Sequence, residues 1–151
     1  MAVNPSTGEI LASELTSNED GDASQAGPLL GQVTGPITSV MADGAYDGEP
    51  VYQAVAERQP DPPVAVVIPP RSTAVPSPAA STAPSQRMGW QKAFGYGRRS
   101  HAETAMFRFK AIIGSRLRAR TLPAQKTEGK VACSVLNRMT RLGMPMSKRT
   151  A

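Results

Sequence analysis

The chain has 151 residues, which is enough for one domain and too few for two of ordinary size. Its 40% hydrophobic content is diluted by 14 prolines and 13 glycines, so we expect a partial core with much loop. A single cysteine excludes an internal disulfide, and no apolar run approaches the roughly 18 residues that a membrane helix requires. No phosphate-binding glycine loop, zinc cluster or Ser-His-Asp set is recognisable. Because there is one cysteine and no leader pattern at Met1, we expect a cytoplasmic protein.

The net charge of +5 is unevenly distributed along the chain. Residues 1–60 carry nine acidic side chains and one basic side chain, whereas residues 61–151 carry three acidic and sixteen basic ones. A polycationic segment of this kind usually neutralises phosphates and gains affinity by releasing counterions from nucleic acid. The alternative is a solvated basic surface that has no partner.

The N-terminal segment predicts a β-hairpin, because turn-forming residues at 4–8 lie between two apolar stretches. Its first strand begins at Met1 and leaves little chain to pair with residues 9–15. We therefore expect that an N-terminal portion of the domain is missing. Capping side chains at 18–22 then predict a short helix that reaches Leu30 and is interrupted by a Gly-Pro pair.

A strand-helix-strand unit is predicted next. The β-branched run 37–42 has the pattern of a strand, and Asp43 follows at its carboxyl end, where α/β sheets bind ligands. Asp47 is expected to cap a helix that ends near Arg58, and residues 63–68 have the pattern of a buried strand. Two strands joined by a helix form a parallel crossover unit, so the predicted fold class is α/β.

Proline, serine, alanine and threonine dominate residues 69–87. This segment is expected to be a flexible linker between a partial α/β core, residues 1–68, and a basic helical part, residues 88–151. In the helical part, one helix is predicted to end at Gly114 and a second to span residues 127–142. The expected apolar faces consist of Ala102, Met106, Phe109 and Ile113 in the first helix, and Val131, Val135, Met139 and Leu142 in the second.

Two acids on this basic background can carry chemistry. Asp43 stands at a strand end, and Glu103 lies on a helix that also presents Arg99 and Lys110 on the same predicted face. Carboxylates supply the hard oxygen ligands for magnesium ions, and a pair of such ions can activate the attacking oxygen and stabilise the leaving one when nucleic acid is cut. Basic side chains beside them can hold the flanking phosphates without competing for the metal.

Four residues form the complete pattern Y-x2-R-x3-E-x6-K: Tyr96, Arg99, Glu103 and Lys110. This pattern resembles the signature of DDE transposases of bacterial insertion sequences. Residues 42–47 are similar to the segment around that family's second catalytic acid, and residues 136–141 resemble its C-terminal helix. The similarity covers essentially the whole chain.

The resemblance implies an incomplete ribonuclease-H-like fold, with Asp43 as the second acid and Glu103 as the third, both ligands of Mg²⁺ or Mn²⁺. Tyr96, Arg99 and Lys110 would contact double-stranded DNA at the element ends. The family's first acid lies on an earlier strand, and no residue here matches it, so we expect the chain alone to be inactive. The implied partners are DNA, a second copy or an intact transposase, in a bacterial cytoplasm near the nucleoid and not in a membrane.

These residues also have purely structural explanations. Asp43 can be a turn acid after a strand, and Glu103 can pair with Arg99 at four-residue spacing. His101 is expected on the surface of a helix, and Cys133 is expected to be a small buried side chain.

Three functions are compatible with the sequence. The first is a truncated insertion-sequence transposase that keeps the second and third acids. The second is a DNA-binding protein without catalysis, which can antagonise an intact transposase. The third is a decayed remnant that does not fold stably, because loss of a central strand exposes backbone groups and apolar surface.

Overall fold

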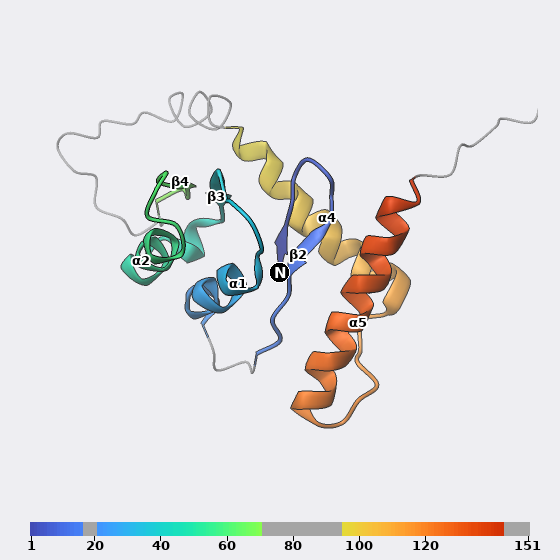
Figure 1. Ribbon diagram of the computed structural model, residues 1–151. Helices are drawn as coiled ribbons and strands as arrows, with labels where there is room; N and C mark the ends of the chain where they lie inside the picture. The colour runs from blue at the N-terminus through green and yellow to red at the C-terminus, as the bar shows by residue number, and fades with distance from the viewer. Residues whose placement is uncertain (17–20, 71–94, 144–151) are drawn as a thin grey trace, which may run out of the picture. The chain divides into compact units, whose positions relative to one another are not determined.

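The computed structural model describes residues 1–16, 21–70 and 95–143, which form two compact units (Figure 1). Unit 1 consists of residues 1–15 and 101–151, and unit 2 consists of residues 16–100. The linker expected at 69–87 lies almost entirely outside the described residues, as do the capping side chains expected at 18–20. The three-part division of the chain therefore stays a prediction.

A parallel pair of strands joined by a helix forms the centre of unit 2. Strand β3 (Ser39–Met41) pairs in parallel with β4 (Ala65–Val67), and α2 (Glu49–Arg58) connects them. Val51 and Val55 of α2 are buried and form its apolar face. The expected strand-helix-strand unit is confirmed, and both helices and small sheets are present, as the α/β class requires.

Helix α1 (Ala26–Gln32) continues a 3₁₀ turn at Asp22–Gln25 and packs against α2. The predicted helix is therefore confirmed, but the predicted interruption is wrong. Pro28 lies in the first turn of α1, where a missing N–H leaves no helical hydrogen bond unmade, so the helix passes through it.

The end of α2 holds the segment that leads into β3. The Arg58 guanidinium donates to the carbonyl of Val33 at 2.8 Å. The Gln59 side chain accepts from the N–H of Ile37 at 2.8 Å and donates to its carbonyl at 3.0 Å and to that of Pro62 at 2.9 Å. These bonds satisfy backbone groups that no ladder reaches, so Arg58, the one base in residues 1–60, has a structural role.

The predicted cap of α2 is wrong. Gly48 occupies the N-cap position in extended backbone, one residue beyond Asp47, and makes no side-chain cap. The carboxylate of Asp47 instead accepts a hydrogen bond from the Tyr52 hydroxyl at 2.8 Å. Burial and this hydrogen bond together raise the pKa of Tyr52 above its ordinary value.

Unit 1 begins with the predicted hairpin. Strands β1 (Ala2–Val3) and β2 (Ile10–Ala12) are antiparallel. Helix α5 (Leu122–Arg141) lies against β2, where Asn137 accepts from the N–H of Ile10 at 2.7 Å and donates to its carbonyl at 2.8 Å. One side-chain amide therefore satisfies both backbone groups of a strand residue and fixes the helix on it.

The other helical segment of unit 1 changes its winding along its length. Helix α4 (Ser100–Arg108) passes into a π-helical turn at Phe109–Ile113, which ends at Gly114 with φ of 122°. That end was predicted, and glycine suits it because other residues rarely adopt positive φ. Helix α5 begins at Leu122, earlier than expected. In the described ranges, no helix is both long and apolar enough to cross a bilayer.

The buried faces of these helices differ from the predicted ones. Helix α5 buries Ala132, Cys133 and Leu136, and α4 buries Ala105. The residues expected to be core are more than two-fifths exposed in several cases: Met106, Val131, Val135, Met139 and Leu142. Phe109 and Ile113 do pack against the core as expected, Cys133 is buried and His101 is exposed.

The buried stripe of α5 is shifted by one residue from the predicted stripe, for a physical reason. Apolar residues stand at both 131–132 and 135–136, so spacing alone does not choose between two neighbouring stripes. The small side chains of Ala132 and Cys133 permit close packing, and Asn137 must face β2 to make its two hydrogen bonds. These needs turn Val131 and Val135 outward.

Replacing Leu136 tests this stripe, because its side chain is 1% exposed while that of its neighbour Val135 is 46% exposed. We expect Leu136→Ala to lower the free energy of unfolding by about 2–5 kcal/mol, through lost burial and a residual cavity. Val135→Ala is the matched control and should change it by less than about 0.5 kcal/mol. Urea denaturation followed by circular dichroism measures both, and equal losses in the two variants would contradict the assigned face.

A second prediction concerns pH. The backbone N–H groups of Arg118 and Ala119 hold the pKa of Glu128 below its ordinary value. A lowered folded pKa contributes stability that is present above the unfolded pKa and is lost as the pH falls through the folded pKa. Glu128→Gln should therefore lower the thermal midpoint at pH 7, and its difference from the unmodified chain should shrink in acid, below about pH 4. A difference that is independent of pH between 7 and 3 would contradict the ionised role.

Candidate functional site

Asp43 directly follows the parallel strand β3 in unit 2. The N–H of Ala42 still reaches the carbonyl of Val67 at 3.4 Å, so the ladder ends just before the acid. One oxygen of Asp43 accepts from the N–H of Ala45 at 3.0 Å and caps a 3₁₀ turn at Gly44–Tyr46. The turn explanation is thus correct as far as it goes, and half of the carboxylate side chain remains exposed at the carboxyl end of the strand.

A second element of unit 2 brings basic and aromatic groups to this acid. The 3₁₀ helix Tyr96–Arg99 follows Gly95, whose φ of 63° is a left-handed conformation that glycine adopts readily. The Arg99 guanidinium lies 3.8 Å from the second oxygen of Asp43 and 5.7 Å from the centre of the Tyr96 ring. An exposed ion pair at this separation contributes at most about 1 kcal/mol, so it does little for stability. Three of the five predicted site residues therefore gather in one place.

Glu103 and Lys110 belong to unit 1. Glu103 is exposed in the first turn of α4, and Lys110 is exposed in the π-helical turn. The expected uniform helical face over residues 99–110 is wrong, because a 3₁₀ turn has about 3.0 residues and a π turn is wider than an α turn. The division between the units falls between Ser100 and His101, inside the Y-x2-R-x3-E-x6-K pattern.

Asp43 and Glu103 are the two metal ligands that the sequence predicts. Magnesium demands near-octahedral oxygen coordination, usually with one or two carboxylates and several waters. Among the described residues, no group of three or more acidic, histidine or cysteine side chains is placed to hold a metal ion. Asp43 and Glu103 lie in different compact units.

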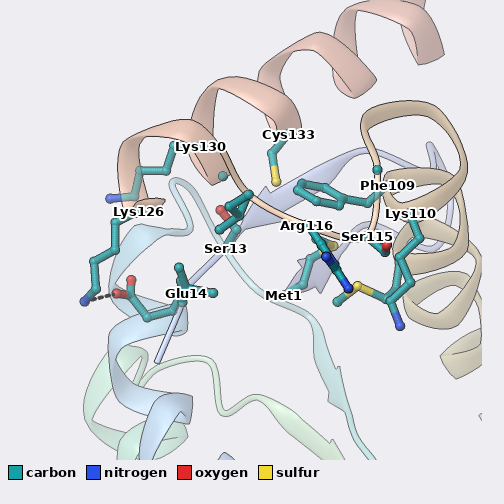
Figure 2. A pocket seen from close by; sticks show the side chains of 15 residues that line it. Met1, Ser13, Glu14, Phe109, Lys110, Ser115, Arg116, Lys126, Lys130 and Cys133 are labelled. Atoms are coloured by element: carbon teal, nitrogen blue, oxygen red, sulfur yellow. Dashed lines mark hydrogen bonds and ion pairs between the residues drawn. The ribbon is translucent and has the colours of Figure 1, made fainter. Parts of the chain in front are cut away.

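Unit 1 contains a cavity of about 290 Å³ that the sequence did not reveal (Figure 2). It lies between the end of β2, the π-helical turn and α5, with Phe109 and Cys133 among its apolar walls. Four basic side chains line it: Lys110, Arg116, Lys126 and Lys130. Lys126 is paired with Glu14 at 2.7 Å. Lys110, predicted from the motif, therefore stands in a wider basic environment.

Positive charge is concentrated in the unit that holds this cavity. The sequence of unit 1 contains 11 basic and 4 acidic residues, whereas unit 2 contains 6 basic and 8 acidic ones. The hairpin brings Glu9 and Glu14 into unit 1, where they pair with Arg141 and Lys126. Even so, unit 1 is strongly cationic. The signal for the further basic residues was available in the sequence as the run of alternating arginines at 116–120.

Comparison with known proteins agrees with these features. The family model for the transposase DDE domain matches residues 1–138. No solved structure matches the chain. The family match spans nearly the whole sequence, includes Asp43 and the complete four-residue pattern, and draws on both compact units. The chain therefore belongs to the transposase DDE domain family.

Proposed function

We propose that this chain is part of an insertion-sequence transposase with a ribonuclease-H-like catalytic fold, and that by itself it binds DNA without cutting it. In this proposal Asp43 and Glu103 are the second and third catalytic acids. Tyr96, Arg99 and Lys110 contact the DNA backbone at the ends of the element. The family membership of residues 1–138 is the observation that carries the proposal.

The charge distribution supports DNA binding. Unit 1 has an excess of basic over acidic residues, and its exposed Lys110 shares a cavity with Arg116 and Lys130. Each phosphate that a lysine or arginine neutralises releases condensed counterions, so binding should depend steeply on salt. A basic surface of this kind explains affinity for any duplex; preference for one sequence requires base contacts in addition.

The arrangement around Asp43 supports its assignment as a catalytic acid. The acid follows a parallel strand, where functional groups of α/β folds gather, and an arginine lies beside it. A guanidinium in that position can hold a phosphate group near the acid, because its planar fork matches phosphate oxygens. The Tyr96 ring below Arg99 restricts the guanidinium and so favours one orientation.

Inactivity of the chain alone is proposed because no residue of this sequence matches the first catalytic acid that the resemblance implies. A cleaving enzyme of this type depends on metal ions that are held at fixed positions. With one of the three acids missing, the near-octahedral geometry that magnesium demands is not completed by the protein. DNA binding needs only the basic side chains, so the two activities should separate in this chain.

The purified chain should bind a short duplex taken from the DNA that flanks its gene, and its affinity should fall steeply between 50 and 200 mM salt, on the scale of the roughly 10³-fold loss seen with six phosphate contacts. Added Mg²⁺ should produce no strand cleavage. Fluorescence anisotropy measures binding, and gel electrophoresis of end-labelled DNA measures cleavage. Mg²⁺-dependent nicking that Asp43→Asn abolishes would show that the chain is a complete enzyme and would refute inactivity.

Variants at the motif sharpen this experiment. Lys110→Ala should lower the slope of log affinity against log salt by about 1, as expected for one lost phosphate contact. Lys126→Gln is the control, because Glu14 already neutralises that ammonium. Unchanged salt dependence in Lys110→Ala would remove this residue from the proposed DNA contacts.

A second candidate function follows if the chain binds DNA but does not cleave it. A chain that occupies element ends without cutting them would antagonise an intact transposase. Adding the chain to an active enzyme of the same element should then reduce cleavage in proportion to the DNA ends that it occupies. Stimulation of cleavage would instead favour a chain that supplies part of the catalytic centre.

A further inference from the structure

The segment between the π-helical turn and α5 has no regular secondary structure, yet its backbone is firmly held. We call residues 115–120 the arginine loop. The Glu128 carboxylate accepts from the backbone N–H of Arg118 at 2.9 and 3.0 Å and from that of Ala119 at 2.8 Å. Gln125 donates to the Ala119 carbonyl at 3.0 Å. Side chains from one helix therefore bind both the donors and an acceptor of the same short segment.

The side chains of the arginine loop alternate in exposure. Arg116, Arg118 and Arg120 are exposed, whereas Leu117 and Ala119 are partly buried. The contacts of Glu128 use backbone N–H groups of the loop, so they leave the guanidinium donors available for a ligand. A held backbone with three exposed guanidinium groups is a surface prepared for several anionic groups at once.

We propose that the arginine loop is a second phosphate-binding surface for the nucleic acid backbone, and that Glu128 is a positioning residue that orders it. This inference rests on the proposed DNA binding, and it adds contacts outside the Y-x2-R-x3-E-x6-K pattern. Arg116 lines the same cavity as Lys110, so the loop continues the basic surface that the motif begins (Figure 2).

Ordering explains why an acid lies within this basic surface. A flexible loop loses conformational entropy when it binds, and a loop that is already held loses less. By charge alone, Glu128 opposes the binding of phosphates. The N–H groups lower the pKa of a carboxyl group whose ordinary pKa already leaves it ionised at neutral pH, so Glu128 carries its negative charge there. If only its charge matters, Glu128 weakens DNA binding. If it orders the loop, Glu128 strengthens DNA binding.

Glu128→Gln distinguishes them. If Glu128 positions the loop, the variant should bind a DNA duplex more weakly, by about fivefold, although it carries one negative charge less. The control is Glu9→Gln, which removes the same charge from unit 1 and leaves the arginine loop untouched, because Glu9 pairs with Arg141. That control should bind as well as the unmodified chain or more tightly. Unchanged or tighter binding by Glu128→Gln would overturn the positioning role.

Arginine variants test the loop itself and do not depend on how Glu128→Gln folds. Arg118→Ala and Arg120→Ala keep every backbone hydrogen bond of the loop, and each should lower the salt slope by about 1. Arg141→Ala, which removes a guanidinium already paired with Glu9, should leave the slope unchanged. Unchanged slopes in both loop variants would refute the phosphate-binding surface. If the unmodified chain shows no salt-dependent binding, the proposed function itself fails, which is a different result.

Discussion

The contact between Asn137 and Ile10 determines the arrangement of unit 1. A two-stranded sheet leaves backbone groups without partners, and one side-chain amide of α5 satisfies both groups of Ile10. This contact fixes the rotation of α5 about its axis. Leu136 and Cys133 then face the core, and Lys126, two turns before Cys133, reaches the cavity. The basic surface thus depends on hydrogen bonds between a neutral side-chain amide and a strand backbone.

Unit 2 is organised by a different constraint, the parallel pairing of β3 with β4. Such pairing requires a crossover, and the α2 crossover ends in Arg58 and Gln59, whose side chains hold the approach to β3. Asp43 consequently stands at the end of a strand whose position is well determined. Its carboxylate caps a turn and also lies beside Arg99. Structural and proposed catalytic roles are therefore compatible in one residue.

Much of this could be predicted from sequence where local chemistry decides the outcome. Turn residues gave the hairpin, β-branched runs gave β3 and β4, and Gly114 marked a helix end, because each signal acts within a few residues. The buried stripe of α5 could not be predicted, since Val135 and Leu136 are both apolar and only the distant partner of Asn137 chooses between them. The motif identified Lys110 by spacing, but the cavity around it required the meeting of three separate segments.

In the proposed function, the basic unit, residues 101–143 with the N-terminal hairpin, supplies most of the contacts with DNA. Backbone hydrogen exchange, measured with and without a short duplex at low salt, tests it most directly. We expect slower exchange in the arginine loop and around Lys110, with little change in residues 21–70 outside the turn that Asp43 caps. Protection confined to residues 21–70 would contradict the account, because that part carries the acidic excess and would then be the surface that holds the nucleic acid.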